Sequence, residues 1–281
     1  MNVAVVTDAL SDGFFFPFWR RYYGSLFGDK NLYVIGYEGG ASFEDATLGG
    51  SLRLPHAYDD ARRPGAYAKF IERLLQTYDT VVRVDADEFL VVDPRVAQSL
   101  PVFLEMTGEA YYSARGFDVL QLPTEAPVAP GTLLAQRQVA YPNSALNKTA
   151  ITRMPLRWGA GFHWASVPPR FSGLFMLHLK RIDIDWQVEW YRTVSRNIAM
   201  NPEVGDDIRD YYRADRERIL SYHRQVAQRP VLRGMDAWYR DAHQANFMAS
   251  IRHDSPSGLY VGEYGHELVL CELPDYFRTL L

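Results

Sequence analysis

Short apolar runs alternate with apolar stripes of helical spacing along the first half of the chain. The runs at residues 3–6, 32–35 and 80–84 are rich in β-branched and large apolar side chains, which is typical of buried strands. Between them, residues 19–27 and 66–78 place large apolar side chains three and four positions apart, which predicts two helices. The order strand, helix, strand, helix, strand favours a mostly parallel sheet with helices packed on it.

The pattern changes after residue 182, where charged, aromatic-rich stretches of helical spacing replace the alternation. A strand predicted at residues 171–179 precedes these stretches, and short strand-like runs at residues 258–261 and 268–271 follow them. The predicted helices span residues 184–199, 206–226 and 235–248. We therefore expect an α/β sheet domain over residues 1–182 and a helical section over residues 183–281, packed together as one continuous unit.

Composition excludes several classes of protein. The 281 residues are 47% hydrophobic and 23% charged, which is ordinary for a globular protein and excludes wholesale disorder. Thirty Lys and Arg residues against 34 Asp and Glu residues give a net charge of −4, which argues against general nucleic-acid binding. The single cysteine, Cys271, excludes an internal disulfide and a cysteine-rich zinc site.

Membrane and export signals are absent from the sequence pattern. No stretch approaches the ~18 apolar residues that a membrane-spanning helix needs, and no cationic segment precedes the first apolar run. The aromatic cluster at residues 14–19 is too short to span a bilayer, and we expect it to pack in the core. These patterns favour a cytoplasmic protein with at most peripheral association at the inner face of the membrane.

The strongest chemical signal is an acidic cluster directly after the predicted strand at residues 80–84. Asp85, Asp87 and Glu88 place three carboxylates within four positions. Burial of such a cluster requires a compensating cation, and a hard divalent ion with oxygen ligands suits it. In an extended backbone Asp85 and Asp87 point the same way, whereas Glu88 points elsewhere. Because ligands bind at the carboxyl ends of strands in open α/β sheets, a metal site is favoured over a solvated acidic turn.

These acids also carry a family resemblance. Asp-Ala-Asp-Glu-Phe-Leu at residues 85–90 resembles the Asp-x-Asp-Glu-Phe motif of GT-A fold glycosyltransferases, especially the glycosyltransferase family 2-like group, with family 92 nearby. Asn-Lys-Thr-Ala-Ile-Thr-Arg at residues 147–153 resembles the lysine-containing strand of that group. Gly-Phe-His at residues 161–163 and Leu-His-Leu-Lys at residues 177–180 resemble its Gly-x-His and Leu-His-x-Lys pair. The likeness covers roughly residues 1 to 185 as ordered motifs.

The resemblance implies a Rossmann-like GT-A fold and a particular reaction. Such enzymes transfer a sugar from a nucleotide-sugar donor to a hydroxyl of a glycan acceptor, and this group does so with inversion. A UDP-sugar is the favoured donor, Mn²⁺ or Mg²⁺ the implied metal ion, and polysaccharide biosynthesis the typical context. The loops at residues 7–9 and 36–40 depart from the group's usual Asn-Glu and Asp-containing loops, so the nucleotide stays open.

Roles for individual residues follow from the same resemblance. Asp87 would hold the metal ion with Asp85 in support, and Asp85 would face the ribose or a metal-bound water. His178 and Lys180 share one face of the predicted strand, as a third metal ligand and a phosphate-binding cation. A hydrogen-bonded histidine beside a solvated lysine is the alternative. The motif favours Lys148 over Arg153 as a cation that points into the site. Further donor-binding candidates are Thr7, Asp8 and Glu38.

The acceptor side of the predicted site has several open candidates. His163 lies in a glycine-rich bend where it would contact the donor sugar or the acceptor, with Trp158 or Trp164 stacking on a sugar face. An ordinary loop histidine beside core tryptophans is the alternative. An inverting transfer needs a general base, for which the candidates are Asp183, Asp185 and Glu189. Each of these acids equally suits the first turn of a helix, and Asp183 suits its N-cap.

Two basic residues in the loop at residues 59–63 are further candidates, as diphosphate ligands. Arg62 and Arg63 follow two aspartates there, and an exposed loop of mixed charge is the favoured interpretation.

Two other functions compete with the transferase. A metal-dependent phosphohydrolase of the haloacid-dehalogenase type would carry Asp-x-Asp after the first strand, and a sugar nucleotidyltransferase would carry a basic glycine-rich loop there. Residues 7–13 match neither pattern. The second competitor is a degenerate transferase that binds a glycan or nucleotide without catalysis, although Asp85, Asp87 and His178 are all retained.

Overall fold

The computed structural model describes residues 1–10, 13–43, 45–202, 204–239 and 242–281. Its main-sheet strands are β1 (Val3–Asp8), β2 (Leu32–Gly36), β3 (Gly50–Arg53), β4 (Thr80–Arg83), β5 (Glu88–Val92), β6 (Tyr111–Leu120), β7 (Val139–Pro142), β8 (Thr149–Thr152), β9 (Phe171–His178), β10 (Val231–Leu232) and β13 (Leu270–Glu272). The α-helices are α1 (Phe16–Phe27), α2 (Arg63–Leu74), α3 (Leu100–Met106), α4 (Ile184–Ile198), α5 (Asp206–Tyr211), α6 (Arg216–Val226), α7 (Ala242–Ser250) and α8 (Asp275–Arg278). A separate hairpin joins β11 (Arg252–Asp254) to β12 (Leu259–Val261).

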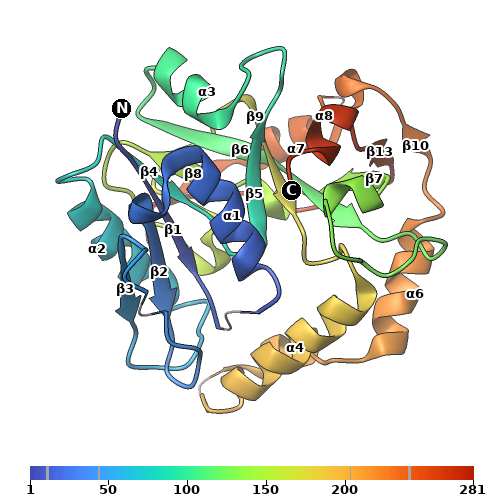
Figure 1. Ribbon diagram of the computed structural model, residues 1–281, viewed down its shortest axis with the longest axis horizontal. Coiled ribbons are helices and arrows are strands. Elements are labelled where there is room, and N and C mark those ends of the chain that lie inside the picture. Colours follow the sequence, from blue (N-terminus) through green and yellow to red (C-terminus); the bar gives the residue numbers. More distant parts are fainter. Residues whose placement is uncertain (11–12, 44, 203, 240–241) are drawn as a thin grey trace.

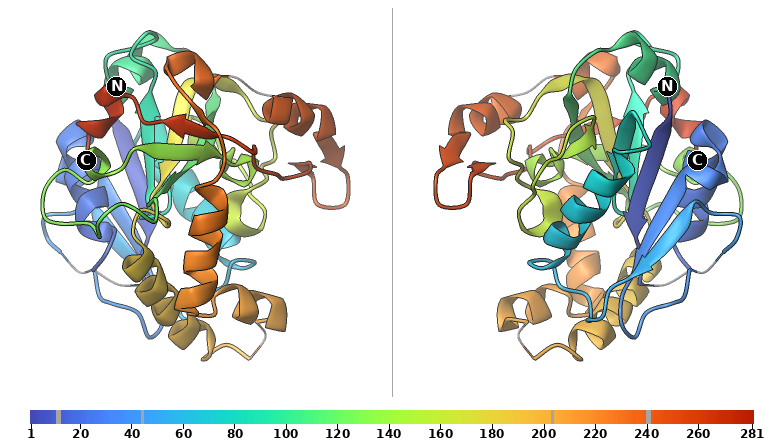
Figure 2. Two further views of the ribbon diagram at one scale, coloured as in Figure 1. Left: turned by 90° about the vertical axis from the view of Figure 1, so that its right-hand side faces the viewer. Right: turned by 90° about the vertical axis from the view of Figure 1, so that its left-hand side faces the viewer.

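The first part of the sheet is parallel and has helices on both faces. Strands β3, β2, β1 and β4 lie side by side in that order, and every neighbouring pair is parallel. Alternate side chains of β1 face opposite layers: Val5 packs in one core with Trp19 of α1, and Val6 in another with Ile71 of α2. Figure 2 shows the two helices on opposite faces of the sheet. The β-α-β-α-β pattern of the sequence therefore predicted this part correctly.

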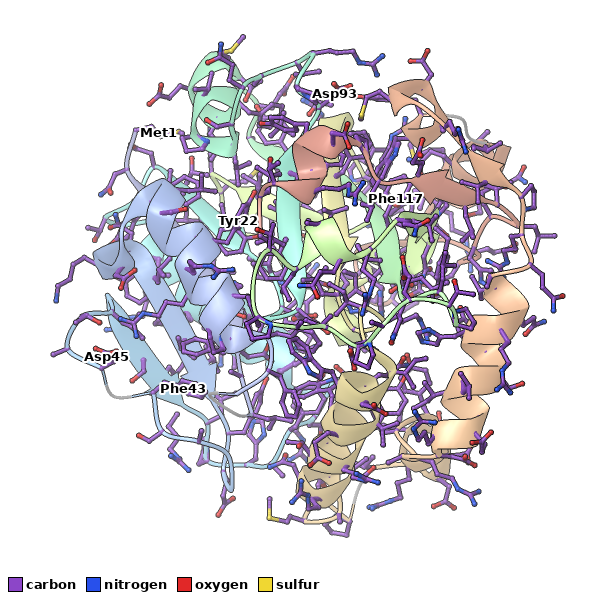
Figure 3. The ribbon with its side chains drawn as sticks, turned by 45° about the vertical axis from the view of Figure 1, so that its right-hand side comes forward. Met1, Tyr22, Phe43, Asp45, Asp93 and Phe117 are labelled. Atoms are coloured by element: carbon purple, nitrogen blue, oxygen red, sulfur yellow. The ribbon has the colours of Figure 1, made fainter. Side chains whose placement is uncertain are left out.

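Beyond β4 the sheet becomes mixed. Strand β8 is antiparallel to β4, β6 is antiparallel to β8, and β9 lies between β6, to which it is parallel, and β5, to which it is antiparallel. The register sets His178 of β9 opposite Glu88 of β5 and Asp118 of β6. The hydroxyl of Tyr22 in α1 donates to the carbonyl of Leu90, which fixes that helix on β5 (Figure 3). This α/β sheet with flanking helices confirms the predicted fold class, although the sheet is mixed beyond β4.

The C-terminal section is less uniformly helical than the sequence pattern predicts. Helix α4 agrees with the predicted range to within one residue and runs below the sheet next to α6 (Figure 1). The single helix predicted over residues 206–226 is wrong, because the chain turns between α5 and α6 and Asp215 caps the second helix. The predicted helix at residues 235–248 is a short 3-10 turn, Met235–Trp238, followed by α7. Strand β13 pairs with β7, so the end of the chain joins the main sheet.

Two further expectations concern apolar residues. Phe15, Phe16 and Trp19 of the aromatic cluster are buried, which confirms the prediction that this cluster packs in the core. Among the described residues, no helix combines the length and the apolar character that crossing a membrane requires.

Candidate functional site

A cavity of about 400 Å³ opens at the carboxyl ends of β1, β2 and β4. This is the edge of an open α/β sheet where ligands bind, and the volume lies within the range of about 300–1,000 Å³ for small-molecule sites. Helices α4 and α5 contribute Trp190, Ile208 and Tyr211 to the opposite wall. Eight of the residues considered as site candidates from the sequence line this cavity: Asp8, Arg63, Asp85, Asp87, Lys148, His163, His178 and Lys180.

The side of the cavity next to β1 and β4 is a compact network of paired charges. Arg63 Nη1 donates to Asp8 Oδ2 at 2.8 Å and to Asp85 Oδ1 at 3.0 Å. Lys148 Nζ donates to Asp85 Oδ2 at 3.1 Å and to Glu88 Oε1 at 2.6 Å. Burial alone raises the pKa of Asp85, but attraction to Arg63 and Lys148 outweighs it and holds that pKa well below its usual range. Both oxygens of Asp85 are therefore committed to cations.

Arg63 is a site residue that the sequence offered as a candidate diphosphate ligand but did not favour. The sequence favoured an exposed loop of mixed charge at residues 59–63, and for Arg63 that prediction is wrong, because its side chain is 5% exposed and lines the cavity. Arg63 is the first residue of α2, so the helix start carries the guanidinium into the sheet edge. Arg62, its neighbour, is half-exposed and pairs with Asp59.

The centre of the cavity holds a histidine between two carboxylates. His178 Nδ1 lies 2.6 Å from Asp118 Oδ1, and Nε2 lies 3.2 Å from Asp87 Oδ2. The backbone nitrogen of Leu179 donates to the carbonyl of Asp87, which fixes the start of β5 beside the end of β9. Burial lowers the pKa of His178, but the carboxylates of Asp87 and Asp118 outweigh burial and raise it to about 10. Sequence reasoning missed Asp118, which stands alone in an apolar strand without a motif.

The Asp87–His178 pair suits a hard divalent cation. Once Nε2 loses its proton, it faces the same point as the Asp87 carboxylate, while Nδ1 keeps its proton and donates to Asp118. Carboxylate support of this kind orients metal-ligating histidines. Within the described residues no group of three or more His, Cys, Asp or Glu side chains is placed to hold a metal ion. An ion here would therefore take its remaining ligands from substrate oxygens and water, as Mg²⁺ commonly does.

Two neighbouring cations, Lys180 and Arg181, also line the cavity, and neither donates a hydrogen bond to a carboxylate among the described residues. Lys180 Nζ donates to the hydroxyl of Tyr211 at 3.1 Å and lies 5.1–5.9 Å from the centres of the Tyr191, Tyr211 and Tyr212 rings. The positive charge of Lys180 is the main reason that the pKa of Tyr211 is lowered to about 8. In the described part of the chain, Lys180 has no carboxylate within ion-pair distance.

Arg181, the other cation, was not singled out from the sequence. Its guanidinium lies 4.2 Å from the centre of the Tyr222 ring, and its Nε is buried without a hydrogen bond among the described residues. The carboxylate that comes closest to that atom belongs to Asp118, at 4.0 Å. Lys180 and Arg181 are thus available to an anion in the cavity.

Two donor-binding candidates from the sequence do not line the cavity. Thr7 is buried inside β1, where its hydroxyl donates to the carbonyl of Asp8. Glu38 is exposed in the turn after β2, and only its backbone is tied down, by His56 and Asn197.

The three acids considered as the general base also lie outside the cavity lining. Asp183 is buried as the N-cap of α4 and accepts from the backbone nitrogen of Trp186, as its position before that helix predicts. Asp185 pairs with Arg216 at 3.0 Å on the exposed side of the helix. Glu189 pairs with Arg192 and Arg196 on the same helix surface. Of the predicted catalytic candidates, only His163 lines the cavity.

Comparisons with known proteins add little to this geometry. No family model matches the chain, and no curated protein matches it. Mannose-1-phosphate geranyltransferase from Thermus thermophilus is 10% identical with a TM-score of 0.31, over 79% of this chain and 68% of that one. TarS of S. aureus is 10% identical with a TM-score of 0.28, over 81% of this chain and 44% of that one. Similarity this low does not indicate a function, so the residues of the cavity are the evidence that bears on it.

Proposed function

We propose that this chain is a metal-dependent glycosyltransferase that moves a sugar from a nucleotide-sugar donor to a hydroxyl of a glycan acceptor. One observation carries the proposal. A metal-competent pair, Asp87 and His178, shares a cavity with two cations, Lys180 and Arg181, that have no hydrogen-bonded carboxylate among the described residues. Carboxylate and imidazole on one side with two cations on the other suit a divalent ion and the diphosphate of a donor.

Each part of the cavity has a task in this proposal. Mn²⁺ or Mg²⁺ held by Asp87 and His178 would neutralise the charge that the departing nucleoside diphosphate gains. Lys180 and Arg181 donate hydrogen bonds to the phosphate oxygens, Lys180 as a point charge and Arg181 through its planar fork. Asp85 is held rigidly by Arg63, Arg83 and Lys148, and the second lone pair of its Oδ2, which accepts from Lys148 alone among the described residues, would accept from a hydroxyl of the ribose. A UDP-sugar is the donor that the motif at residues 85–90 favours.

Nucleotide binding provides the first test. Thermal unfolding is measured with UDP, GDP, CMP and dTDP, each with Mn²⁺, with Mg²⁺ and with EDTA. A ligand that binds the native state raises the midpoint by mass action. We expect one nucleotide to raise it only in the presence of a divalent ion. Asp87→Asn should abolish that metal-dependent rise, because one of the two protein ligands loses its charge.

Asp93→Asn is the matched control. Asp87 and Asp93 flank β5 at opposite ends, and both are buried aspartates with a lowered pKa (Figure 3 labels Asp93). Asp93 pairs with Arg95 and accepts from Tyr239, and it does not line the cavity. The nucleotide effect should survive in Asp93→Asn. If no nucleotide shifts the wild-type midpoint with either metal, the proposed donor site is wrong.

Turnover separates a transferase from the competing enzyme class. A transferase without its acceptor hydrolyses one nucleotide sugar slowly, and that hydrolysis depends on the metal ion. A phosphohydrolase would instead release phosphate from many phosphate esters, including 4-nitrophenyl phosphate. Rapid cleavage of several such esters, lost in Asp87→Asn, would replace the transferase proposal with a phosphohydrolase.

A further inference from the structure

A small appendage of the C-terminal section reaches back to the cavity. Helix α7 and the hairpin of β11 and β12 lie outside the main sheet and stand out from its body (Figure 2). Several contacts fasten this appendage: the backbone nitrogen of Tyr260 donates to the carbonyl of Ala165, that of Ser144 to the carbonyl of Gly265, and Arg157 to the carbonyls of Ser257 and Gly258. The segment after β12 consequently brings Tyr264 to the edge of the cavity.

Tyr264 presents a large aromatic surface there. Its ring lies 4.6 Å from that of Trp164 at an interplanar angle of 10°, and Trp164 in turn lies nearly parallel to Phe247 of α7. The stack holds the Tyr264 ring in one orientation. Tyr264 is 47% exposed, which is a large exposed fraction for an aromatic residue. A rigid, half-exposed aromatic ring at a cavity edge is suited to cover a flat ligand.

A hydrogen-bond acceptor lies beside this ring. The His163 ring is 5.3 Å from that of Tyr264, and its Nδ1 donates to the carbonyl of Ala145 at 2.5 Å. Because Nδ1 keeps the proton, Nε2 is left as the acceptor. Burial, followed by the charge of Lys148, lowers the pKa of His163 to about 3, so this tautomer persists at neutral pH. Among the described residues, no hydrogen bond reaches Nε2.

Local backbone geometry maintains that arrangement. Gly161 has φ of 61°, a conformation that side-chain-bearing residues rarely adopt. A Cβ atom at Gly161 would lie 2.5 Å from Nε2 of His163. Only glycine therefore lets the histidine ring sit where it does.

Tyr264 reaches the cavity from a different part of the fold than the residues proposed to bind the nucleotide. Asp8, Tyr37 and Asp85 lie at the ends of the parallel strands β1, β2 and β4. Tyr264 instead precedes Gly265, which is bonded to Ser144 in the 3-10 turn after β7, on the antiparallel part of the sheet. A donor bound across Asp87 and His178 would leave the Tyr264 end for the second substrate.

We infer that Tyr264 and His163 form the acceptor subsite and that its ligand is a pyranose. The apolar C–H face of the sugar would lie on the Tyr264 ring, and one hydroxyl would donate to Nε2 of His163. A hydrocarbon acceptor would leave Nε2 without a partner, which favours a sugar over a lipid chain. This inference rests on the proposed function, since it names the acceptor class of the same site.

The experiment uses simple sugars as probes. Methyl α- and β-pyranosides of glucose, galactose, mannose and N-acetylglucosamine are titrated against the full chain with Mg²⁺ and UDP, and saturation-transfer NMR reports bound protons. We expect at least one glycoside to bind through the protons of one ring face. Tyr264→Ala should weaken that binding about tenfold, the size of one lost aromatic contact, and Tyr264→Phe should preserve it.

Tyr260→Ala is the matched control, since it removes another tyrosine ring from the same appendage, outside the cavity lining. Glycoside binding should survive in Tyr260→Ala, and a similar loss in both alanine variants would point to a loosened appendage and overturn the inference. It is also overturned if no glycoside binds the wild type, or if binding is equal in wild type and Tyr264→Ala. Nucleotide binding to the wild type without glycoside reports on the proposed function separately. If a glycoside binds in a Tyr264-dependent way but no nucleotide binds in a metal-dependent way, the sugar-binding site is supported and the transferase proposal is wrong.

Discussion

At the scale of single residues, Asp118 supports the proposed metal site without contacting the metal ion. It does not point at the proposed metal position but accepts from Nδ1 of His178, while Asn143 donates to its other oxygen at 2.9 Å. We expect Asp118→Asn to raise the metal concentration needed for nucleotide binding by about 10- to 100-fold, as loss of such supporting groups usually does. The measurement is a Mn²⁺ titration of the nucleotide-dependent shift in thermal midpoint.

The control for Asp118 is a residue that touches the same neighbourhood without supporting the histidine. Tyr222 packs on Arg181 and donates to or accepts from the hydroxyl of Tyr141. Tyr222→Phe should leave the metal titration within about twofold of wild type, since it removes one exchangeable hydrogen bond. An unchanged metal requirement in Asp118→Asn would mean that His178 does not ligate the ion.

The sequence identified residues that the structure brings together where a motif marks a strand end, and their roles stay predictions. Asp85, Asp87 and His178 fall at the ends of β4 and β9, and the structure brings all three to one cavity. Asp118 and Arg181 lack such a signal. The importance of Asp118 comes from its register opposite His178, 60 positions away in sequence, which no local pattern encodes.

At the scale of elements, strand β6 and the 3-10 turn after β7 can pack closely only because a glycine lies at their contact. Gly116 of β6 packs against the 3-10 turn Ser144–Leu146, and a Cβ there would lie 2.6 Å from the carbonyl carbon of Leu146 and 2.7 Å from its Cα. Gly116→Ala should lower the free energy of unfolding by about 1–3 kcal/mol, the usual cost of overpacking. Chemical denaturation measures this loss. Because Lys148 follows the same turn, we expect nucleotide binding to weaken as well.

Gly65→Ala provides the comparison for that change. Gly65 lies in the first turn of α2, and a Cβ there meets no atom within 4 Å. Alanine should raise stability by up to about 1 kcal/mol, because it favours the helix. Equal losses in the two variants would show that β6 and the turn can separate without strain.

Helices α4 and α6 meet the end of β6 at a buried histidine. Nδ1 of His223 in α6 donates to the carbonyl of Gln121 at 2.9 Å, and Nε2 lies 3.1 Å from the side-chain amide of Gln187, whose nitrogen donates to the neutral ring when the amide is turned toward it. Burial is the main cause that lowers the pKa of His223 to about 4, whereas an unfolded histidine titrates near 6.5. The unfolded chain therefore binds the proton first, and the stability from the neutral ring is present above pH 6.5 and lost as the pH falls to 4.

The expected loss is about 3 kcal/mol over that range, from about 1.4 kcal/mol for each pKa unit. Urea unfolding at pH 7, 6, 5 and 4 measures it. His223→Asn keeps a donor for the carbonyl of Gln121 but cannot titrate. Its free energy of unfolding should therefore fall less steeply with decreasing pH, with a slope smaller by the equivalent of up to one bound proton. Parallel pH profiles for the two proteins would contradict the assignment of this loss to His223.

Helix limits agreed with the predicted ranges where one apolar periodicity persists, and they differed where a polar capping residue interrupts the pattern. The apolar stripe of α4 is unbroken and its limits were predicted closely. The stripe over residues 206–226 also looks continuous, yet Asp215 accepts from the backbone nitrogen of Arg218 and starts a new helix. A capping acid inside a helical pattern is therefore the signal that sequence reasoning underweighted.

At the scale of the whole molecule, the remaining question is whether the sheet domain stands alone. The division predicted at residue 182 separates β1 to β9 of the mixed sheet from the helices that follow. In the structure, Tyr191 and Val194 of α4 share a buried cluster with Ile35 of β2, and Cys271 of β13 pairs with Ala140 of β7. A chain ending at residue 182 would expose that cluster and leave β7 as a new sheet edge.

We therefore expect residues 1–182 alone to lack a cooperative thermal transition, whereas the full chain unfolds in one step observed alike by far-UV circular dichroism and tryptophan fluorescence. The fragment should also fail to bind a nucleotide, since α4 and α5 supply Trp190, Ile208 and Tyr211 to the cavity wall. Two separate transitions in the full chain, with the first preserved in the fragment, would instead establish an independent sheet domain. In that case the C-terminal section would act as a detachable cover, and nucleotide binding by the fragment would place the donor site wholly within the parallel sheet.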